Sequence, residues 1–191
     1  MREPGPKATA SPSPSPEGSA TTWGGPASSQ TVRRLSPAEA AEGRVPVDVA
    51  VGVLMQRDAQ GRDDAFLLTT RPEGKVWAGY WEFPGGKFEP GETVEQALAR
   101  ELHEELGIQV GTVTRWREQL MDYPHARVRL HFCKVYDWAG DFEMREGQAM
   151  SWQCLPVACV PVLPGTVPVL EWLAEERGFT GATHTATEVA P

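Results

Sequence analysis

The sequence predicts an α/β fold in which a β-sheet lies between helices, an α/β/α sandwich. From about residue 46 to residue 178, apolar segments of strand length alternate with two amphipathic segments of helical period. Placing the two helices on opposite sides of the sheet buries the apolar face of each. No internal repeat is visible, so the pattern indicates one domain.

The strands are predicted from short apolar runs bounded by turn residues. The first two runs form a hairpin, because residues 47–57 and 65–70 bracket the polar turn DAQGRDD. Three further strands are predicted at 112–121, 128–138 and 150–155, with turns at 123–125 and 138–141. The first apolar run, at 47–55, is too short to span a bilayer, so no membrane association is expected.

Two helices are predicted, at 94–106 and 167–177. Thr93 and Gln96 form a capping box at the start of the first helix, and Gly107 is expected to end it. The second helix contains the sequence PVLEWLAEER and is amphipathic.

The first predicted helix carries Glu101, Glu104 and Glu105, at positions i, i+3 and i+4. At about 100° per residue these carboxylates fall within an arc of about 100°. A neighbouring stripe can pack on the sheet, and it consists of Leu98, Leu102 and Leu106. Like charges this close destabilise a bare helix, and within the segment only Arg100 offers a cation. The face is therefore either a solvated surface or a site for a divalent metal, and carboxylate ligands suit Mg2+ or Mn2+.

A longer pattern favours the metal site. Residues 86–108 read GKFEPGETVEQALARELHEELGI. Several residue types in this segment recur at fixed spacings from one another: Gly86, Glu92, Arg100, the pair Glu104-Glu105 and Gly107. This segment matches the signature of the Nudix hydrolases at every defined position. The chain therefore resembles metal-dependent enzymes that hydrolyse a nucleoside diphosphate linked to another group.

Flanking motifs resemble the MutT-type branch of that superfamily, the 8-oxo-dGTP diphosphatases. They are WEFPGGK at 81–87 and EGQ at 146–148, followed by Trp152, and the likeness spans about residues 47–175. The resemblance implies a mixed sheet between helices. It also implies Mg2+-dependent hydrolysis, with Mn2+ as an alternative ion, of a nucleoside triphosphate to nucleoside monophosphate and pyrophosphate.

The resemblance also implies a set of metal ligands. Glu101 and Glu105 would be the principal ligands, with Glu104 beside them and the Gly85 carbonyl completing the shell. Glu146, on a separate loop, would join the metal site or assist the attacking water. The alternative for Glu146 is an ordinary exposed turn residue.

Other residues would position groups or bind substrate. Glu92 and Arg100 would hold the loop to the helix and orient the ligand carboxylates. Arg71 would contact phosphate, the alternative being a surface ion pair, and Phe83 would pack on the nucleobase, the alternative being a core residue. Thr166 stands where 8-oxoguanine-specific members carry asparagine, and its single hydroxyl puts that selectivity in question.

Composition divides the chain into three parts. Residues 1–44 are rich in Pro, Ser, Gly and Ala and are expected to be a disordered arm; residues 45–178 form the hydrolase domain and 179–191 a flexible tail. The absence of a signal-peptide-like stretch predicts a cytoplasmic protein. The net charge of -8 argues against polynucleotide binding, but it does not exclude a small nucleotide that comes with a metal.

Two alternatives to an 8-oxo-dGTP diphosphatase remain open. One is a relative that acts on CTP or modified dCTP, and the other is a catalytically inert nucleotide sensor. The cysteines lack zinc-site spacing and are expected to be reduced structural thiols: Cys133, Cys154 and Cys159. The oligomeric state is left open, and a monomer is compatible with the sequence.

Overall fold

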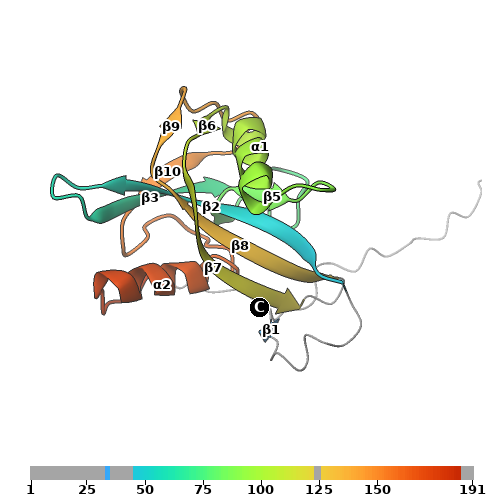
Figure 1. Ribbon diagram of the computed structural model, residues 1–191. Helices are drawn as coiled ribbons and strands as arrows, with labels where there is room; N and C mark the ends of the chain where they lie inside the picture. Colours follow the sequence, from blue (N-terminus) through green and yellow to red (C-terminus); the bar gives the residue numbers. More distant parts are fainter. Residues whose placement is uncertain (1–32, 35–44, 123–125, 186–191) are drawn as a thin grey trace, which may run out of the picture.

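The computed structural model describes residues 33–34, 45–122 and 126–185 (Figure 1). Most of the expected N-terminal arm, the predicted turn at 123–125 and the last six residues lie outside the described residues. The strands are β1 (Arg33–Arg34), β2 (Val47–Arg57), β3 (Asp63–Thr70), β4 (Trp81–Glu82), β5 (Gly85–Lys87), β6 (Gln109–Val110), β7 (Val113–Asp122), β8 (Arg127–Val135), β9 (Trp138–Ala139) and β10 (Met150–Gln153). The helices are α1 (Val94–Leu106) and α2 (Val167–Arg177).

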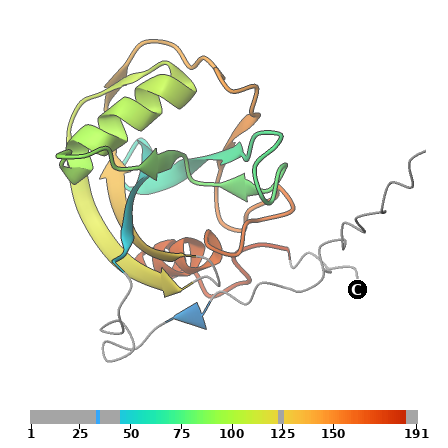
Figure 2. The same cartoon turned by 90° about the vertical axis from the view of Figure 1, so that its right-hand side faces the viewer.

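The main sheet is mixed. Its strands run in the order β1-β7-β8-β2-β3-β10, with β4 paired to β3 and β5 paired to β2. The β2–β8 pair is parallel, and the other pairs of this sheet are antiparallel. α1 and α2 cover opposite faces of the sheet (Figures 1 and 2). The predicted α/β/α sandwich is therefore confirmed.

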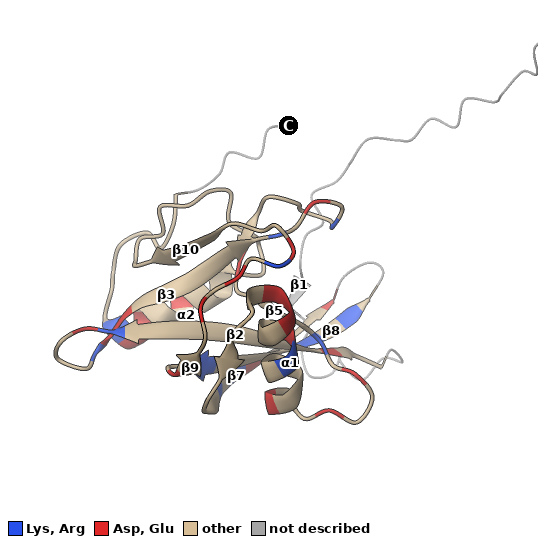
Figure 3. Cartoon of the chain, turned by 90° about the horizontal axis from the view of Figure 1, so that it is seen from above, with Lys and Arg blue, Asp and Glu red and all other residues tan. Residues whose placement is uncertain are grey.

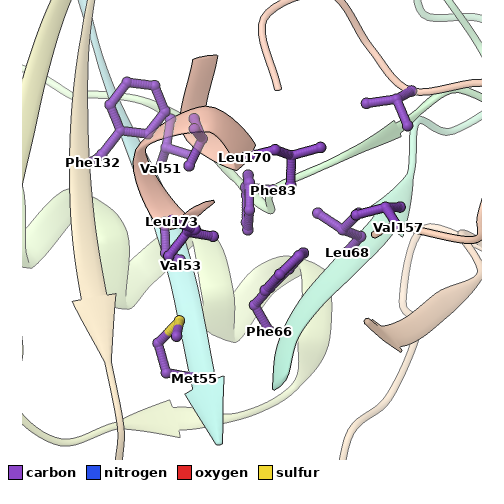
Figure 4. Packing of buried hydrophobic residues seen from close by; sticks show 12 residues of the cluster. Val51, Val53, Met55, Phe66, Leu68, Phe83, Phe132, Val157, Leu170 and Leu173 are labelled. Atoms are coloured by element: carbon purple, nitrogen blue, oxygen red, sulfur yellow. The ribbon is translucent and has the colours of Figure 1, made fainter. Parts of the chain in front are cut away.

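The central strand β2 supplies both layers of the core. Ala50 and Leu54 pack beneath α1, whereas Val51, Val53 and Met55 alternate with them and pack towards α2 (Figure 4). Residues on a strand alternate between its faces. A strand that is covered on both faces therefore reads as a continuous apolar run, as β2 does.

α1 is anchored to β2 by its leucine stripe. Leu98, Leu102 and Leu106 are fully buried. A Cβ at Gly52 of β2 would lie 3.2 Å from a methyl carbon of both Leu98 and Leu102, so the glycine allows the helix to approach the strand closely. The predicted separation of an apolar stripe from an acidic one on this helix is confirmed.

Both ends of α1 follow the prediction. The Thr93 side chain accepts from the Gln96 N–H, and the Gln96 side chain accepts from the Thr93 N–H at 2.9 Å, which completes the capping box. Gly107 ends the helix with φ of 75°, in the left-handed region. The capping box and the glycine after the helix thus predict both limits of the helix that carries the glutamates.

The structure differs from the prediction at short strands and at strand ends. β1 lies within the range expected to be disordered and pairs with β7, while β4, β5 and β6 are too short to show an alternating pattern. The predicted strand at 128–138 ends at Val135, and Trp138, expected in a turn, starts β9 instead. These pairings depend on neighbouring strands in space rather than on local period.

The three cysteines are free thiols, and burial raises the pKa of Cys133 to about 11. Among the described residues, no helix is long and apolar enough to cross a membrane.

We expect Leu102→Ala to lower the free energy of unfolding by about 2–5 kcal/mol, because it removes a fully buried side chain and leaves a cavity above Gly52. His103→Ala is the control, since this neighbour is exposed and its loss should cost no more than about 0.5 kcal/mol. Urea unfolding in EDTA measures both. Equal effects would show that the stripe does not anchor the helix.

Candidate active site

Arg100 clamps the loop that precedes α1 to the helix. Its Nε and Nη2 donate to the two carboxylate oxygens of Glu92 at 2.8 and 3.0 Å, and Nη2 also donates to the Lys87 carbonyl at 2.8 Å. This two-point contact fixes direction as well as distance. Its hydrogen bonds to Glu92 hold the pKa of Arg100 above its usual range, and those same bonds lower the pKa of Glu92. The pair has the geometry expected of positioning residues.

The remaining nitrogen of Arg100 faces the carboxylates of α1. Nη1 donates to Glu101 Oε1 at 2.9 Å and to Glu104 Oε2 at 3.1 Å. The Glu101 side chain is 16% exposed and that of Glu104 is 57% exposed. A Cβ at Gly86 would lie 2.3 Å from the Glu101 carboxyl carbon. Glycine at this position therefore makes room for the carboxylate.

Glu105 is the most constrained of the three glutamates. Its Oε2 accepts from the Gly85 N–H at 3.2 Å. Burial, and then the charges of Glu146 and Glu101, raise the pKa of Glu105 to about 7. Gly85 has φ of 144°, and a Cβ there would lie 2.1 Å from the Ala50 carbonyl oxygen, so no larger residue fits. Backbone and helix thus meet at one carboxylate, which the Gly85 N–H holds through a hydrogen bond.

The loop that leads to β10 lies beside this helix (Figure 3), and Glu146 belongs to that loop. The Glu105 carbonyl, at the end of α1, accepts from the Arg145 N–H at 3.1 Å and from the Gln148 amide at 3.0 Å. The last carbonyls of a helix lack partners within it, and here the loop supplies them. Gln148, which is 6% exposed, also accepts from the Glu146 N–H at 2.9 Å. The predicted E-G-Q loop is therefore docked beside the glutamate helix.

The donor set fits a hard divalent cation. Across the described parts of the chain, no three His, Cys, Asp or Glu side chains are already grouped closely enough to hold a metal ion. Arg100 engages Glu101 and Glu104 instead, and Lys75 engages Glu146. Burial raises the pKa of Glu105, and the negative charges of Glu146 and Glu101 raise it further. Carboxylate oxygens of this kind are the ligands that Mg2+ and Mn2+ prefer.

Arg71 is engaged by protein groups. Its Nη1 donates to both carboxylate oxygens of Glu82, at 2.8 and 2.6 Å, and its Nε donates to the Val76 carbonyl at 2.8 Å. The ion pair offered as the alternative for Arg71 is present, although the pair is half-buried. A phosphate contact for Arg71 stays a prediction.

Phe83 and Thr166 lie in the protein interior. Phe83 is 5% exposed, and its ring centroid lies 5.7 Å from that of Phe66 in the core on the α2 side (Figure 4). Thr166 is 3% exposed, and its hydroxyl donates to the Trp81 carbonyl at 3.4 Å. The alternative for Phe83, a core residue, is the one that its burial supports. Contacts from either side chain to a nucleobase stay predictions.

Two participants at the site were not identified from the sequence. Gln148 lies in the E-G-Q motif, so the motif carried a signal, but its tie to the end of α1 did not show. Lys75 carried no signal, because 71 positions separate it from Glu146 in the chain. The contact of Gln148 arises where its loop packs on the end of α1, and that of Lys75 arises where a second loop meets the first.

We expect Arg100→Lys to lower the free energy of unfolding in EDTA by about 1.5–3 kcal/mol, because an ammonium cannot reproduce the hydrogen bonds to Glu92 and Lys87 together. Arg115→Lys is the matched control. Arg115 also pairs with a glutamate of α1, Glu95, but their side chains are 62% and 41% exposed, so the substitution should lower the free energy of unfolding far less than Arg100→Lys does. Similar losses from both variants, measured by urea unfolding, would contradict the clamp.

Comparison with known proteins places this geometry in a family. A CTP pyrophosphohydrolase of Escherichia coli is 39% identical over 112 residues, which cover 58% of this chain and 82% of that protein. An 8-oxo-dGTP diphosphatase of Haemophilus influenzae is 39% identical over 106 residues, covering 56% of this chain and 74% of that protein.

Solved structures show the same fold. The solution structure of the E. coli ORF135 protein has a TM-score of 0.58 and 35% identity, covering 70% of this chain and 92% of that one. The crystal structure of a MutT NUDIX hydrolase from Burkholderia pseudomallei has a TM-score of 0.58 and 26% identity, covering 67% and 98%. Residues 46–173 match the NUDIX domain, and the chain therefore belongs to the NUDIX family.

Proposed function

We propose that this NUDIX hydrolase is a metal-dependent nucleoside triphosphate diphosphatase that releases nucleoside monophosphate and pyrophosphate. The observation that carries the proposal is the half-buried Glu105 carboxylate, which accepts from the Gly85 N–H and lies close enough to Glu146 and Glu101 for their negative charges to act on it. The names of its relatives, which include CTP and 8-oxo-dGTP as substrates, support a nucleoside triphosphate as the substrate class.

Mg2+, with Mn2+ as an alternative, would be held mainly by Glu101 and Glu105. Glu104, Glu146 and the Gly85 carbonyl would complete the set of oxygen ligands. When bound, the ion polarises phosphate oxygens, lowers the pKa of the attacking water and offsets charge on the leaving group. Regions of the chain that lie well apart in sequence thus supply one site.

The protein's own groups then have distinct tasks. Arg100 and Glu92 keep the carboxylates of α1 aimed at the site, and the Gly85 N–H fixes one oxygen of Glu105. The water oxygen bonds to one of the two phosphorus atoms of the anhydride between the α- and β-phosphates as that anhydride bond breaks. A carboxylate of the cluster accepts the proton of the water, and the products are nucleoside monophosphate and pyrophosphate.

For the nucleobase we propose 8-oxo-dGTP, which would make the enzyme a sanitiser of the nucleotide pool. One observation favours the CTP or modified dCTP alternative. The Thr166 hydroxyl, which stands where 8-oxoguanine-specific members carry asparagine, already donates to the Trp81 carbonyl within the protein. No feature of the described residues favours an inert sensor. We further propose that the enzyme acts in the cytoplasm on free nucleotides rather than on polynucleotides, in line with its net charge of -8.

We expect Glu105→Gln and Glu101→Gln each to lower kcat at limiting Mg2+ by about 100-fold or more, because groups that merely support metal ligands are worth about 10–100-fold. Glu95→Gln, on the exposed side of the same helix, should leave kcat within about twofold. The melting temperature of Glu105→Gln in EDTA should be unchanged or raised, because the substitution removes a charge that burial disfavours. A near-normal kcat in Glu105→Gln would contradict the proposal that Glu105 is a metal ligand.

We expect kcat/KM for 8-oxo-dGTP to exceed that for dGTP, CTP and dCTP, with only a small preference over dGTP. One hydroxyl contributes about 0.5–1.5 kcal/mol, or roughly 2- to 13-fold. Thr166→Val, which keeps the shape and removes the hydroxyl, should erase that preference, and Thr166→Asn should widen it. If Thr166→Val changes the melting temperature but not the preference among substrates, the hydroxyl only stabilises the fold through its hydrogen bond to the Trp81 carbonyl. If CTP or dCTP is the best substrate, the alternative function is correct.

A further inference from the structure

The segment between β3 and β4, residues 72–80, forms a loop that is closed at its base. The Arg71 N–H donates to the Tyr80 carbonyl at 2.8 Å, and the Gly79 N–H donates to the Arg71 carbonyl at 2.9 Å. The Arg71 side chain reaches back to the Val76 carbonyl at 2.8 Å. The loop is therefore anchored at both ends by one residue.

The tip of this loop is exposed and has an unfavourable backbone. Val76 is 68% exposed, and Trp77 has φ of 66°, in the left-handed region that side chains rarely adopt. Gly74, with φ of 83°, makes the preceding turn. Non-glycine residues in this region persist where surrounding contacts impose them, and such residues cluster at binding sites. The loop therefore presents its tip to solvent in a defined shape.

Lys75 lies on this tip and faces the acidic cluster. Its Nζ lies 3.0 Å from Glu146 Oε2, and the two side chains are 47% and 39% exposed. Burial raises the pKa values of Glu105 and Glu82, and the positive charge of Lys75 opposes part of that rise. Lys75 thus approaches the carboxylates from a different element than Arg100 does.

The two cations at the site are held very differently. Arg100 is 21% exposed and has four partners, namely Glu92, Glu101, Glu104 and the Lys87 carbonyl. Lys75 is half-exposed, and among the described residues Glu146 is the side chain with which it pairs. An exposed ion pair contributes little, so exchanging the partners of Lys75 is cheap. Arg100 has the geometry of a fixed part and Lys75 that of an exchangeable one.

We propose that Lys75 is an exchangeable cation: it holds Glu146 while the metal is absent, and it binds the phosphates of the substrate once the metal has taken that carboxylate. The inference rests on the proposed function, because it requires Glu146 to belong to the metal site. A lysine ammonium is a compact charge with three donors on a flexible stem, and the closed base of the loop keeps it beside the site. The alternative is a lysine that only fastens the loop.

Mn2+ binding without nucleotide tests the first half. Free Mn2+ is followed by its electron paramagnetic resonance signal in titrations of the full chain. Lys75→Met should bind Mn2+ about two- to fivefold more tightly, because Glu146 no longer has a competing cation. Lys75→Arg should stay near the unmodified protein. Arg62→Met is the charge-matched control, since it breaks an exposed pair with Asp58 at the far end of the β2–β3 hairpin and should have no effect (Figure 1).

A double-variant cycle identifies the carboxylate involved. In a Glu146→Gln background, Lys75→Met should no longer tighten Mn2+ binding, because the group for which lysine and metal compete has lost its charge. Tightening of the same size in both backgrounds would mean a general charge effect and would overturn the inference. If Glu146→Gln leaves Mn2+ binding unchanged, the inference also fails, whereas hydrolysis supported by Glu101 and Glu105 still stands.

Steady-state kinetics at saturating Mg2+ tests the second half. Lys75→Met should raise KM for the nucleoside triphosphate about tenfold and change kcat less, as expected when a contact made in both the bound and transition states is lost. Lys75→Arg should recover most of the affinity, and Arg62→Met should not differ from the unmodified enzyme. An unchanged KM would overturn the inference even if Mn2+ binding is tighter. A lysine that only fastens the loop would lower the melting temperature in EDTA without moving KM or Mn2+ affinity.

Discussion

The crowding of carboxylates on one face of α1 is the constraint around which the rest of this structure is arranged. Like charges at i, i+3 and i+4 destabilise a helix, and burial of Glu105 adds to that cost. The neighbouring stripe of leucines offsets the cost by packing on β2, where Gly52 lets the helix approach closely. The capping box and the loop docked on the last carbonyls of the helix stabilise its two ends. An acidic site is thus maintained by apolar contacts and hydrogen bonds outside it.

Positive charge near the acidic face is distributed in two ways, and the difference is functional. Arg100 makes directional hydrogen bonds to several groups and has little freedom, so it holds carboxylates in fixed positions. Lys75 reaches Glu146 from an exposed loop through a single contact. A site that must gain and lose a divalent ion and a polyanionic substrate needs both kinds of cation. A second rigid arginine would compete permanently with the metal.

What could be predicted from the sequence depended on whether the signal was local. The limits of α1, its leucine stripe and its acidic stripe follow from offsets of three or four residues, and the structure has all of them. β4 and β5 were missed because two- and three-residue strands have no period and exist only through pairing with β3 and β2. The burial of Phe83 and Thr166 also depends on distant segments, since Phe66 and the Trp81 carbonyl are their partners.

The sheet separates phosphate chemistry from the residues expected to read the base. The carboxylates belong to α1 and its neighbouring loop, whereas Phe83 and Thr166 pack in the core on the α2 side. The short segment from Phe83 to Gly85 connects the two, because it starts in the α2-side core and ends at Glu105. With the proposed roles, changes around the start of α2 would alter base preference while the proposed metal ligands stay in place. Relatives named for CTP and for 8-oxo-dGTP each share 39% identity with this chain, which is compatible with such a separation.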